Sequence, residues 1–432
     1  MKNSLILAAI LAVAPIAFAA PAKDPDYVKQ ADKEWRALIE PLLPLGKTLA
    51  KKFPQAKDEQ ARAELFRFMY SEFGAGYMQL IYASPKHPDF IPNWTQVFNN
   101  GGMLNPDNVY QFSPLDADGV YKISGFRGSV HIVDFQIGAS PTFARGRANK
   151  DKNFGPTLAN YDIDKMHIGP DGAFDFILSA KRPEGYEGDW RALPPTSDHV
   201  LVRQLSYDWL NEVDARLAID RLDTPAAKPR QTPAEIKEAL SFIPEWTERW
   251  VKMAIGPKEA EHMDWMTRWG AKDKIVLIDF TKDEGGRAAQ KYIAGHFDVT
   301  PDTAMIYEMA PGNCRFWNLH LGNDLLNTLD FMNRQVSLNG FSAKTDSDGR
   351  IRIVISEKDP GVNNWLDSMG YKTGTIWGRL DGCEDYTTPT IKTVKLGDVR
   401  KNLPPDTVLV TAEEREASIR IRRKGAQLRR RW

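Results

Sequence analysis

Residues 171–179 read Asp-Gly-Ala-Phe-Asp-Phe-Ile-Leu-Ser, and residues 348–356 read Asp-Gly-Arg-Ile-Arg-Ile-Val-Ile-Ser. Each stretch is a turn dipeptide followed by alternating apolar residues and a serine, which is typical of a strand entered through a tight turn. Two such stretches in one chain predict that a single β-rich unit occurs twice.

The flanks of the two stretches repeat in the same order, which strengthens this prediction. Val-Asp-Phe-Gln-Ile-Gly (133–138) precedes the first stretch, and Trp-Asn-Leu-His-Leu-Gly (317–322) precedes the second. Each stretch is then followed by a tryptophan and, in a later strand-like run, by an arginine: Trp190 and Arg203, then Trp365 and Arg379.

Length and patterning predict a mainly β protein with α additions. A chain of 432 residues is too long for one ordinary core, so we expect two β-sandwich domains. The expected order is a signal peptide (1–19), an N-terminal helical region (20–95), a first β-sandwich domain (96–224), a helical linker segment (225–299), a second β-sandwich domain (300–410) and a basic C-terminal helix (411–432). Within the linker segment we expect helices near 257–269 and 284–296.

The N-terminus has the pattern of an export signal. Lys2 precedes an apolar run from Leu5 to Ile16, and Ala17-Phe-Ala19 fits a cleavage site, which we place after Ala19. The alternative is a membrane anchor, for which the run is short. We therefore expect a periplasmic or secreted protein.

Two cysteines, Cys314 and Cys383, are the only ones in the chain. An exported protein meets oxidising conditions, so a disulfide is expected if the flanking strands pair antiparallel. Two separate buried thiols are the alternative.

Composition and motifs exclude several classes of function. The formal net charge is zero, which gives no field that favours nucleic acid. No His-Glu-x-x-His, Cys-x-x-Cys, Walker or Gly-x-Ser-x-Gly motif occurs, so the sequence predicts no metal site and no cofactor.

The end of the chain predicts a basic helix that begins with Thr411 as N-cap and Glu414 three residues later, a capping box. Its basic residues indicate contact with an anionic surface, such as lipid head groups or an acidic polymer. We favour the other interpretation, a solvated terminal helix held by Ile419 and Leu428.

Three stretches in the second unit carry a family resemblance. Residues 316–330, 334–339 and 356–367, the last containing Asp-Pro-Gly-Val-Asn-Asn-Trp-Leu-Asp, resemble the domain of unknown function 1214 family. Upstream, Asn105-Pro-Asp-Asn and the segment 201–209 look like elements of a domain of unknown function 1254 unit. The resemblance implies jelly-roll-like β-sandwiches, and it brings no established activity and no catalytic residues.

Polar residues within the repeated strands are the first candidate site. Gln136 and His320 occupy matching places, and Asn318 shares a strand face with His320 while Trp317 points the other way. Such a face is either solvated or lines a cavity. Arg203 and Arg379 also recur in phase, and each needs either a nearby aspartate or an anionic ligand.

The loop 359–367 is the second candidate. Asp359, Asn364, Trp365 and Asp367 combine carboxylates, an amide and an aromatic ring, a set that suits sugars or steroid-like rings. The same residue types also make turns by capping backbone groups. Further side chains expected at this cleft are Arg334, Gln335 and Asn339.

Three functions follow from these observations. The first is a binding protein that holds a small hydrophobic or glycan-like ligand in a β-sandwich cleft. The second is a cofactor-independent hydrolase or lyase in which His320 acts as acid or base with Asp359 or Asp367. The third is an envelope structural protein whose basic tail contacts an anionic surface. The sequence makes no prediction of the oligomeric state.

Overall fold

The computed structural model describes residues 24–139, 155–255, 274–279 and 290–429. The chain divides into two compact units, Met1–Leu43 and Pro44–Trp432. The described part of the first unit holds α1 (Asp26–Ile39) and a 3-10 turn (Glu40–Leu42), neither of which buries a residue. The signal peptide expected at 1–19 lies outside the described residues.

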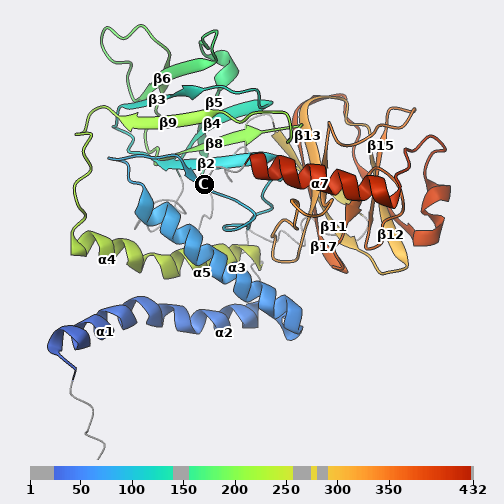
Figure 1. Ribbon diagram of the computed structural model, residues 1–432, viewed down its shortest axis with the longest axis horizontal. Coiled ribbons are helices and arrows are strands. Elements are labelled where there is room, and N and C mark those ends of the chain that lie inside the picture. The colour runs from blue at the N-terminus through green and yellow to red at the C-terminus, as the bar shows by residue number, and fades with distance from the viewer. Residues whose placement is uncertain (1–23, 140–154, 256–273, 280–289, 430–432) are drawn as a thin grey trace, which may run out of the picture. The chain divides into compact units, whose positions relative to one another are not determined.

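Helices open the second unit and return after its first β-sheets (Figure 1). They are α2 (Leu43–Lys52), α3 (Glu59–Tyr77), α4 (Pro233–Ser241) and α5 (Ile243–Ala254). Asp58 caps α3 by accepting a hydrogen bond from the Ala61 amide at 2.9 Å. Trp246 and Trp250 of α5 pack against Ala75 at the end of α3.

The first β half consists of two sheets. Their strand orders are β1-β2-β8-β4-β5 and β7-β6-β3-β9. The strands are β1 (Ile91–Pro92), β2 (Asn108–Pro114), β3 (Tyr121–Phe126), β4 (Ile132–Gly138), β5 (Thr157–Asp162), β6 (Ala173–Ser179), β7 (Trp190–Ala192), β8 (His199–Leu205) and β9 (Arg216–Arg221).

The second β half repeats this plan, with the orders β10-β11-β17-β13-β14 and β16-β15-β12-β18. Its strands are β10 (Ile275–Ile278), β11 (Gln290–Asp298), β12 (Thr303–Met309), β13 (Asn313–Gly322), β14 (Ser337–Asn339), β15 (Ile351–Ser356), β16 (Trp365–Asp367), β17 (Thr373–Glu384) and β18 (Thr390–Lys395). The β6–β7 and β15–β16 pairs are both parallel, whereas the other pairs are antiparallel. The two β-sandwich halves predicted from the repeated stretches are therefore confirmed.

The sequence landmarks fall on equivalent strands. Trp190 begins β7 opposite Ile177, and Trp365 begins β16 opposite Val354. Each tryptophan donates its indole N–H to the serine that ends the neighbouring strand, at 3.1 Å to Ser179 and 3.0 Å to Ser356. Each serine hydroxyl in turn donates to the carbonyl two residues further on. The repeated Ser and Trp are thus one structural device used twice.

The start of the second half lies earlier than we predicted. Residues 284–296 are not a helix in their described part, because β11 pairs with β10 on one side and β17 on the other. Ile293 and Phe297 of β11 alternate into the core of the sandwich. The second sandwich therefore begins within the segment 225–299 that we expected to be helical. The helix expected at 257–269 lies outside the described residues.

The C-terminal helix α7 (Ala412–Leu428) begins with the predicted capping box of Thr411 and Glu414. Leu428 does not hold it, since it is 57% exposed, whereas Ile419 is partly buried. Arginines spaced by seven residues hold it instead, because this spacing places them on one face. Arg415 pairs with Asp359 of the second half, and Arg429 pairs with Asp214 of the first half, each at 2.9 Å.

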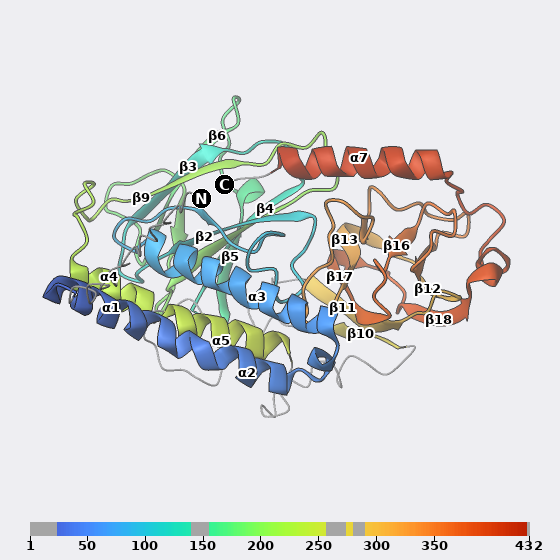
Figure 2. The same cartoon turned by 60° about the horizontal axis from the view of Figure 1, so that its bottom comes forward.

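Between these two anchors, the Arg422 guanidinium lies 4.4 Å from the centre of the Trp209 ring and donates to the carbonyl of Phe331. Helix α7 therefore runs alongside both halves and ties them together (Figure 2). Our interpretation of α7 as a solvated helix is wrong for the face that carries Arg415 and Arg422, because this face packs on the two halves.

The predicted disulfide joins Cys314 and Cys383. The two residues lie directly opposite each other on β13 and β17, with Cα atoms 3.9 Å apart. The alternative of two separate thiols is excluded by this register. In the residues that the structure describes, no helix is long and apolar enough to cross a membrane.

Candidate ligand pocket between the two halves

The polar residues singled out on β4 and β13 lie on the face opposite each sandwich core. Phe135 and Leu319 point into the cores, so their neighbours Gln136, Asn318 and His320 point out of them. These polar side chains are nevertheless buried, with 3% of Gln136 and 0% of Asn318 and His320 exposed. The expectation of a solvated face is therefore wrong. The reason is that the two halves cover each other here, as Phe316 packs on Ile132 and Leu205.

The carboxylate of Asp107 is the polar hub of this contact. Asn318 Nδ2 donates to Asp107 Oδ2 at 2.8 Å, and Asn339 Nδ2 donates to Asp107 Oδ1 at 2.7 Å. Trp209 Nε1 also donates to Asp107 Oδ1, at 2.8 Å. Burial raises the pKa of the Asp107 carboxyl, and these hydrogen bonds oppose that rise. Asn318 and Asn339, which we expected to bind a ligand, thus join the two halves.

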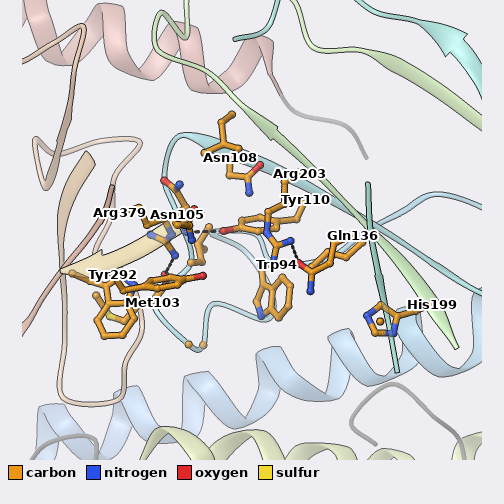
Figure 3. A pocket seen from close by; sticks show the side chains of 18 of the residues that line it. Trp94, Met103, Asn105, Asn108, Tyr110, Gln136, His199, Arg203, Tyr292 and Arg379 are labelled. Atoms are coloured by element: carbon orange, nitrogen blue, oxygen red, sulfur yellow. Dashed lines mark hydrogen bonds between the residues drawn. The ribbon is translucent and has the colours of Figure 1, made fainter. Parts of the chain in front are cut away.

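A pocket of about 120 Å³ lies beside this hub. Both halves line it from equivalent register positions: Tyr110 and Tyr292 stand opposite Arg203 and Arg379. The remaining equivalent pairs in the lining are Asn108 with Gln290 and Leu201 with Trp377. The rest of the wall consists of Trp94, residues 101–105, Gln136, Gly138, Gly155, Pro156, His199 and Leu205 (Figure 3).

The two arginines have different surroundings in this pocket. The half-buried Arg203 donates to Gln136 Oε1. Arg379 donates through NH2 to the Met103 carbonyl at 2.8 Å, and its guanidinium lies 5.6 Å from the centre of the Tyr292 ring (Figure 3). The structure therefore brings together three of the predicted ligand-binding residues, Gln136, Arg203 and Arg379.

Several buried polar atoms of the lining have no hydrogen-bond partner among the described residues. They are Asn105 Nδ2, Asn108 Oδ1 and NH1 of Arg379. Buried polar groups are almost always satisfied, and unsatisfied ones point to a water, ion or ligand. The described lining also contains two arginines and no aspartate or glutamate. The pocket therefore offers hydrogen bonds and positive charge to a bound molecule.

His320 does not line this pocket and lacks the carboxylate partner that we expected. Burial, followed by the charge of Arg379, lowers the pKa of its imidazole well below the ordinary value, although a contact with the Met103 backbone opposes this. Neither ring nitrogen makes a hydrogen bond to a described residue. Asp359 pairs with Arg415, and Asp367 pairs with Arg334 at 2.5 Å. The structure does not assemble the expected acid–base pair.

The loop 359–367 holds its own backbone in place. Asn364 Nδ2 donates to the Lys344 carbonyl at 2.6 Å, and its Oδ1 accepts from the Lys344 amide at 2.8 Å. Gln335 Nε2 donates to the Trp365 carbonyl at 2.7 Å. Trp317 lies in the core of the second sandwich. These predicted ligand-binding residues, together with Arg334, are not among those that line the pocket.

Sequence reasoning missed most of the pocket wall, namely Trp94, Asn108, Tyr110, Gln290, Tyr292 and Trp377. One signal was available: Asn108-Val-Tyr110 and Gln290-Lys-Tyr292 repeat an amide, one residue and a tyrosine. In the described residues, no group of three or more His, Cys, Asp or Glu side chains is placed to hold a metal ion.

Comparison with known proteins gives a family model and structural relatives. Residues 303–382 match the model of the family described as "Protein of unknown function (DUF1214)". This match lies in the second half, so the likeness of the first half to a domain of unknown function 1254 unit stays a prediction. None of the curated proteins matches the chain.

Among solved structures, an uncharacterized protein from Burkholderia cenocepacia is similar to this chain with 25% identity and a TM-score of 0.74, covering 85% of this chain and 98% of its own. A protein from Vibrio parahaemolyticus is 15% identical with a TM-score of 0.45, over 77% of this chain and 98% of its own. The chain is thus similar over residues 303–382 to a family of unknown function, and over most of its length to an uncharacterized protein.

Proposed function

We propose that this protein binds a small molecule in the pocket between its two β halves. The observation that carries the proposal is the set of equivalent residues that both halves direct into one pocket, with buried polar atoms left unsatisfied there. Ligand sites in proteins are typically apolar clefts with a few fixed polar groups, and they often lie between domains.

The lining supports a ligand with a flat or apolar body. Trp94, Tyr110, Tyr292 and Trp377 supply aromatic surface. Asn108 and Gln290 supply amides for hydroxyl or carbonyl groups, as a sugar ring or a polar aromatic molecule carries. A volume of about 120 Å³ suits a body of roughly one ring, since an engineered cavity of about 150 Å³ accommodates benzene.

Neither alternative function gains support from the geometry. His320 is fully buried and has no carboxylate partner among the described residues, which disfavours acid–base catalysis. Arg415, Arg422 and Arg429 at α7 contact the protein itself, so fewer basic side chains remain for an anionic surface.

We also propose that the protein is exported, because its apolar N-terminus and its disulfide both suit an oxidising compartment.

Native mass spectrometry tests the proposal most directly. Protein purified from the periplasm of its own host is expected to carry an additional small mass that denaturation releases. The variant with both Asn108→Ala and Gln290→Ala removes the paired amides and is expected to lose most of that mass. Gln60→Ala, an exposed change on α3 outside this pocket, is the matched control. Retention of the ligand by the double variant contradicts binding at this site.

A further inference from the structure

We infer that the ligand is a small anion with a flat body, and that Arg379 binds its carboxylate. This inference rests on the proposed function, because it names the chemical class of the molecule in the same pocket. It follows from three independent observations on Arg379: its missing ion pair, its position in the duplicated fold, and the charges around it.

Arg379 differs from the other buried arginines. Arg221, Arg415 and Arg429 each pair with a carboxylate, at 2.5, 2.9 and 2.9 Å. Arg379 is as deeply buried, with 7% exposed, yet it forms no ion pair with a described residue, and its NH1 has no hydrogen-bond partner there. A buried cation without a counter-charge is costly, so such groups are normally paired.

In the other copy, a carboxylate occupies the position opposite the equivalent arginine. Asp134 on β4 lies directly opposite Arg203 on β8, and residues directly opposite share a face. The equivalent position opposite Arg379 holds Asn318. The amide of Asn318 points its Nδ2 to Asp107 and is neutral, so it does not compensate the charge of Arg379.

The remaining groups near Arg379 leave the pocket positive. An arginine side chain carries a full positive charge. His320, on the neighbouring strand, has its pKa lowered well below its ordinary value and is neutral at pH 7. Asp381, two residues further on, does not line the pocket, and Asp107 already accepts hydrogen bonds from two amides and an indole. An anion from outside the described chain is therefore the matching partner.

The held orientation of Arg379 defines the binding mode. Its NH2 is fixed by the Met103 carbonyl, and its guanidinium lies close to the Tyr292 ring, which leaves NH1 for an oxyanion (Figure 3). Charge-assisted hydrogen bonds from arginine to carboxylate are about twice as strong as neutral ones. The aromatic walls then take the flat body, so a single-ring aromatic carboxylate fits best.

Calorimetric titration with benzoate and its neutral isostere benzamide tests the inference. We expect benzoate to bind about tenfold or more tightly than benzamide, since one hydrogen bond to a charged group is worth that factor. Phenyl phosphate is the third probe and separates carboxylate from phosphate recognition. Equal affinity for benzoate and benzamide, or tighter binding of phenyl phosphate than benzoate, overturns the inference.

Two variants at equivalent positions make the test specific. Arg379→Gln is expected to remove the preference for benzoate, whereas Arg203→Gln is expected to keep it. Because Arg379 forms no ion pair with a described residue, the ligand-free Arg379→Gln protein should melt no lower than the wild type, which distinguishes lost binding from lost folding. A preference for benzoate that persists in Arg379→Gln contradicts the inference.

If the co-purifying ligand is neutral, the charge assignment fails and the proposed function stands. If no ligand co-purifies and no probe binds, both fail.

Discussion

The two β halves share their strand order and their tryptophan–serine hydrogen bond, yet they differ on the faces that meet the pocket. Asp134 and Gln136 in the first half correspond by register to Asn318 and His320 in the second. The tyrosine and arginine that both halves place in the pocket wall are repeated, as is the tryptophan–serine hydrogen bond. The neighbouring positions on β4 and β13 differ, and in the second half Asn318 joins the two halves by donating to Asp107.

A second difference lies on the far sheets of the two sandwiches. Lys122 on β3 is exposed and forms a surface ion pair with Asp175 at 3.1 Å. The equivalent position on β12 is Ile306, which is buried with Val399 of the 3-10 segment η5 (Leu396–Asn402). Among the described residues, such a covering layer is present on the second half and not over Lys122, and α7 begins ten residues after it. The second half therefore provides the support from which α7 reaches the first half.

The largest effect is expected from breaking the link between the halves. Arg429→Met removes the partner of Asp214, and the exposed fraction of Asp214 is only 2%. An uncompensated buried carboxylate costs about 3–5 kcal/mol, so we expect a clear drop in melting temperature measured by calorimetry. Arg420→Met on the same helix breaks only an exposed pair with Glu416 and should change stability by less than about 0.5 kcal/mol. If the two variants lower the melting temperature equally, the Arg429–Asp214 pair does not link α7 to the first half as we infer.

A medium effect is expected from a substitution in the helical layer that packs on the first half. Trp94 joins this layer to the first half, because its ring contacts both Tyr110 of β2 and Trp250 of α5. Burial raises the pKa of Glu72 on α3 from 4.5 to about 8, and a hydrogen bond from Trp246 opposes this. The folded state thus holds a proton that the unfolded chain releases above its lower pKa. The free energy of unfolding should therefore fall between about pH 5 and pH 8, by up to about 1.4 kcal/mol per pH unit.

Glu72→Gln is the test of this pH dependence, because glutamine resembles the protonated acid and still accepts from Trp246. We expect denaturant unfolding of this variant to be flatter than that of the wild type between pH 5 and pH 8. Glu59→Gln, an exposed change on the same helix, should leave the slope as it is in the wild type. An unchanged slope in Glu72→Gln means that Glu72 is ionised in the fold.

The smallest effect is expected at the tryptophan–serine hydrogen bond that both halves share. Trp365→Phe removes the hydrogen bond to Ser356 and replaces the indole that lies 5.2 Å from the Arg415 guanidinium by a smaller phenyl ring with a weaker cation–π attraction, and should cost about 2 kcal/mol. Trp190→Phe removes only the matching bond to Ser179 and should cost about 1 kcal/mol. Thermal unfolding of the two variants measures the difference. A larger cost at Trp190 reverses the order that the contacts predict.

The fold was predictable where the signal is local. Alternating apolar residues, turn dipeptides and the capping box of α7 each depend on neighbours within a few positions, and the structure contains all of them. The strand β11 was missed because Lys291-Tyr-Ile-Ala has no strict alternation of apolar and polar residues, and its place is set by pairing with β17.

The pocket was predictable only in part, since its wall joins residues that are far apart in the chain. Arg203, Arg379 and Gln136 were found because the repeat marks them, whereas Trp94 belongs to neither copy. The inward arginines of α7 were missed because basic side chains usually face solvent. A seven-residue spacing of Arg415, Arg422 and Arg429 was the available sign of a buried stripe.

The position of α7 in the chain has a consequence for biosynthesis. Ribosomes release the N-terminal part of a chain first, and domains generally fold as units while the rest is still being made. The Asp214 carboxylate and the Trp209 ring emerge long before the arginines that cover them. The first half therefore exposes Asp214 to water until α7 docks, and docking of α7 is the step that buries this acid.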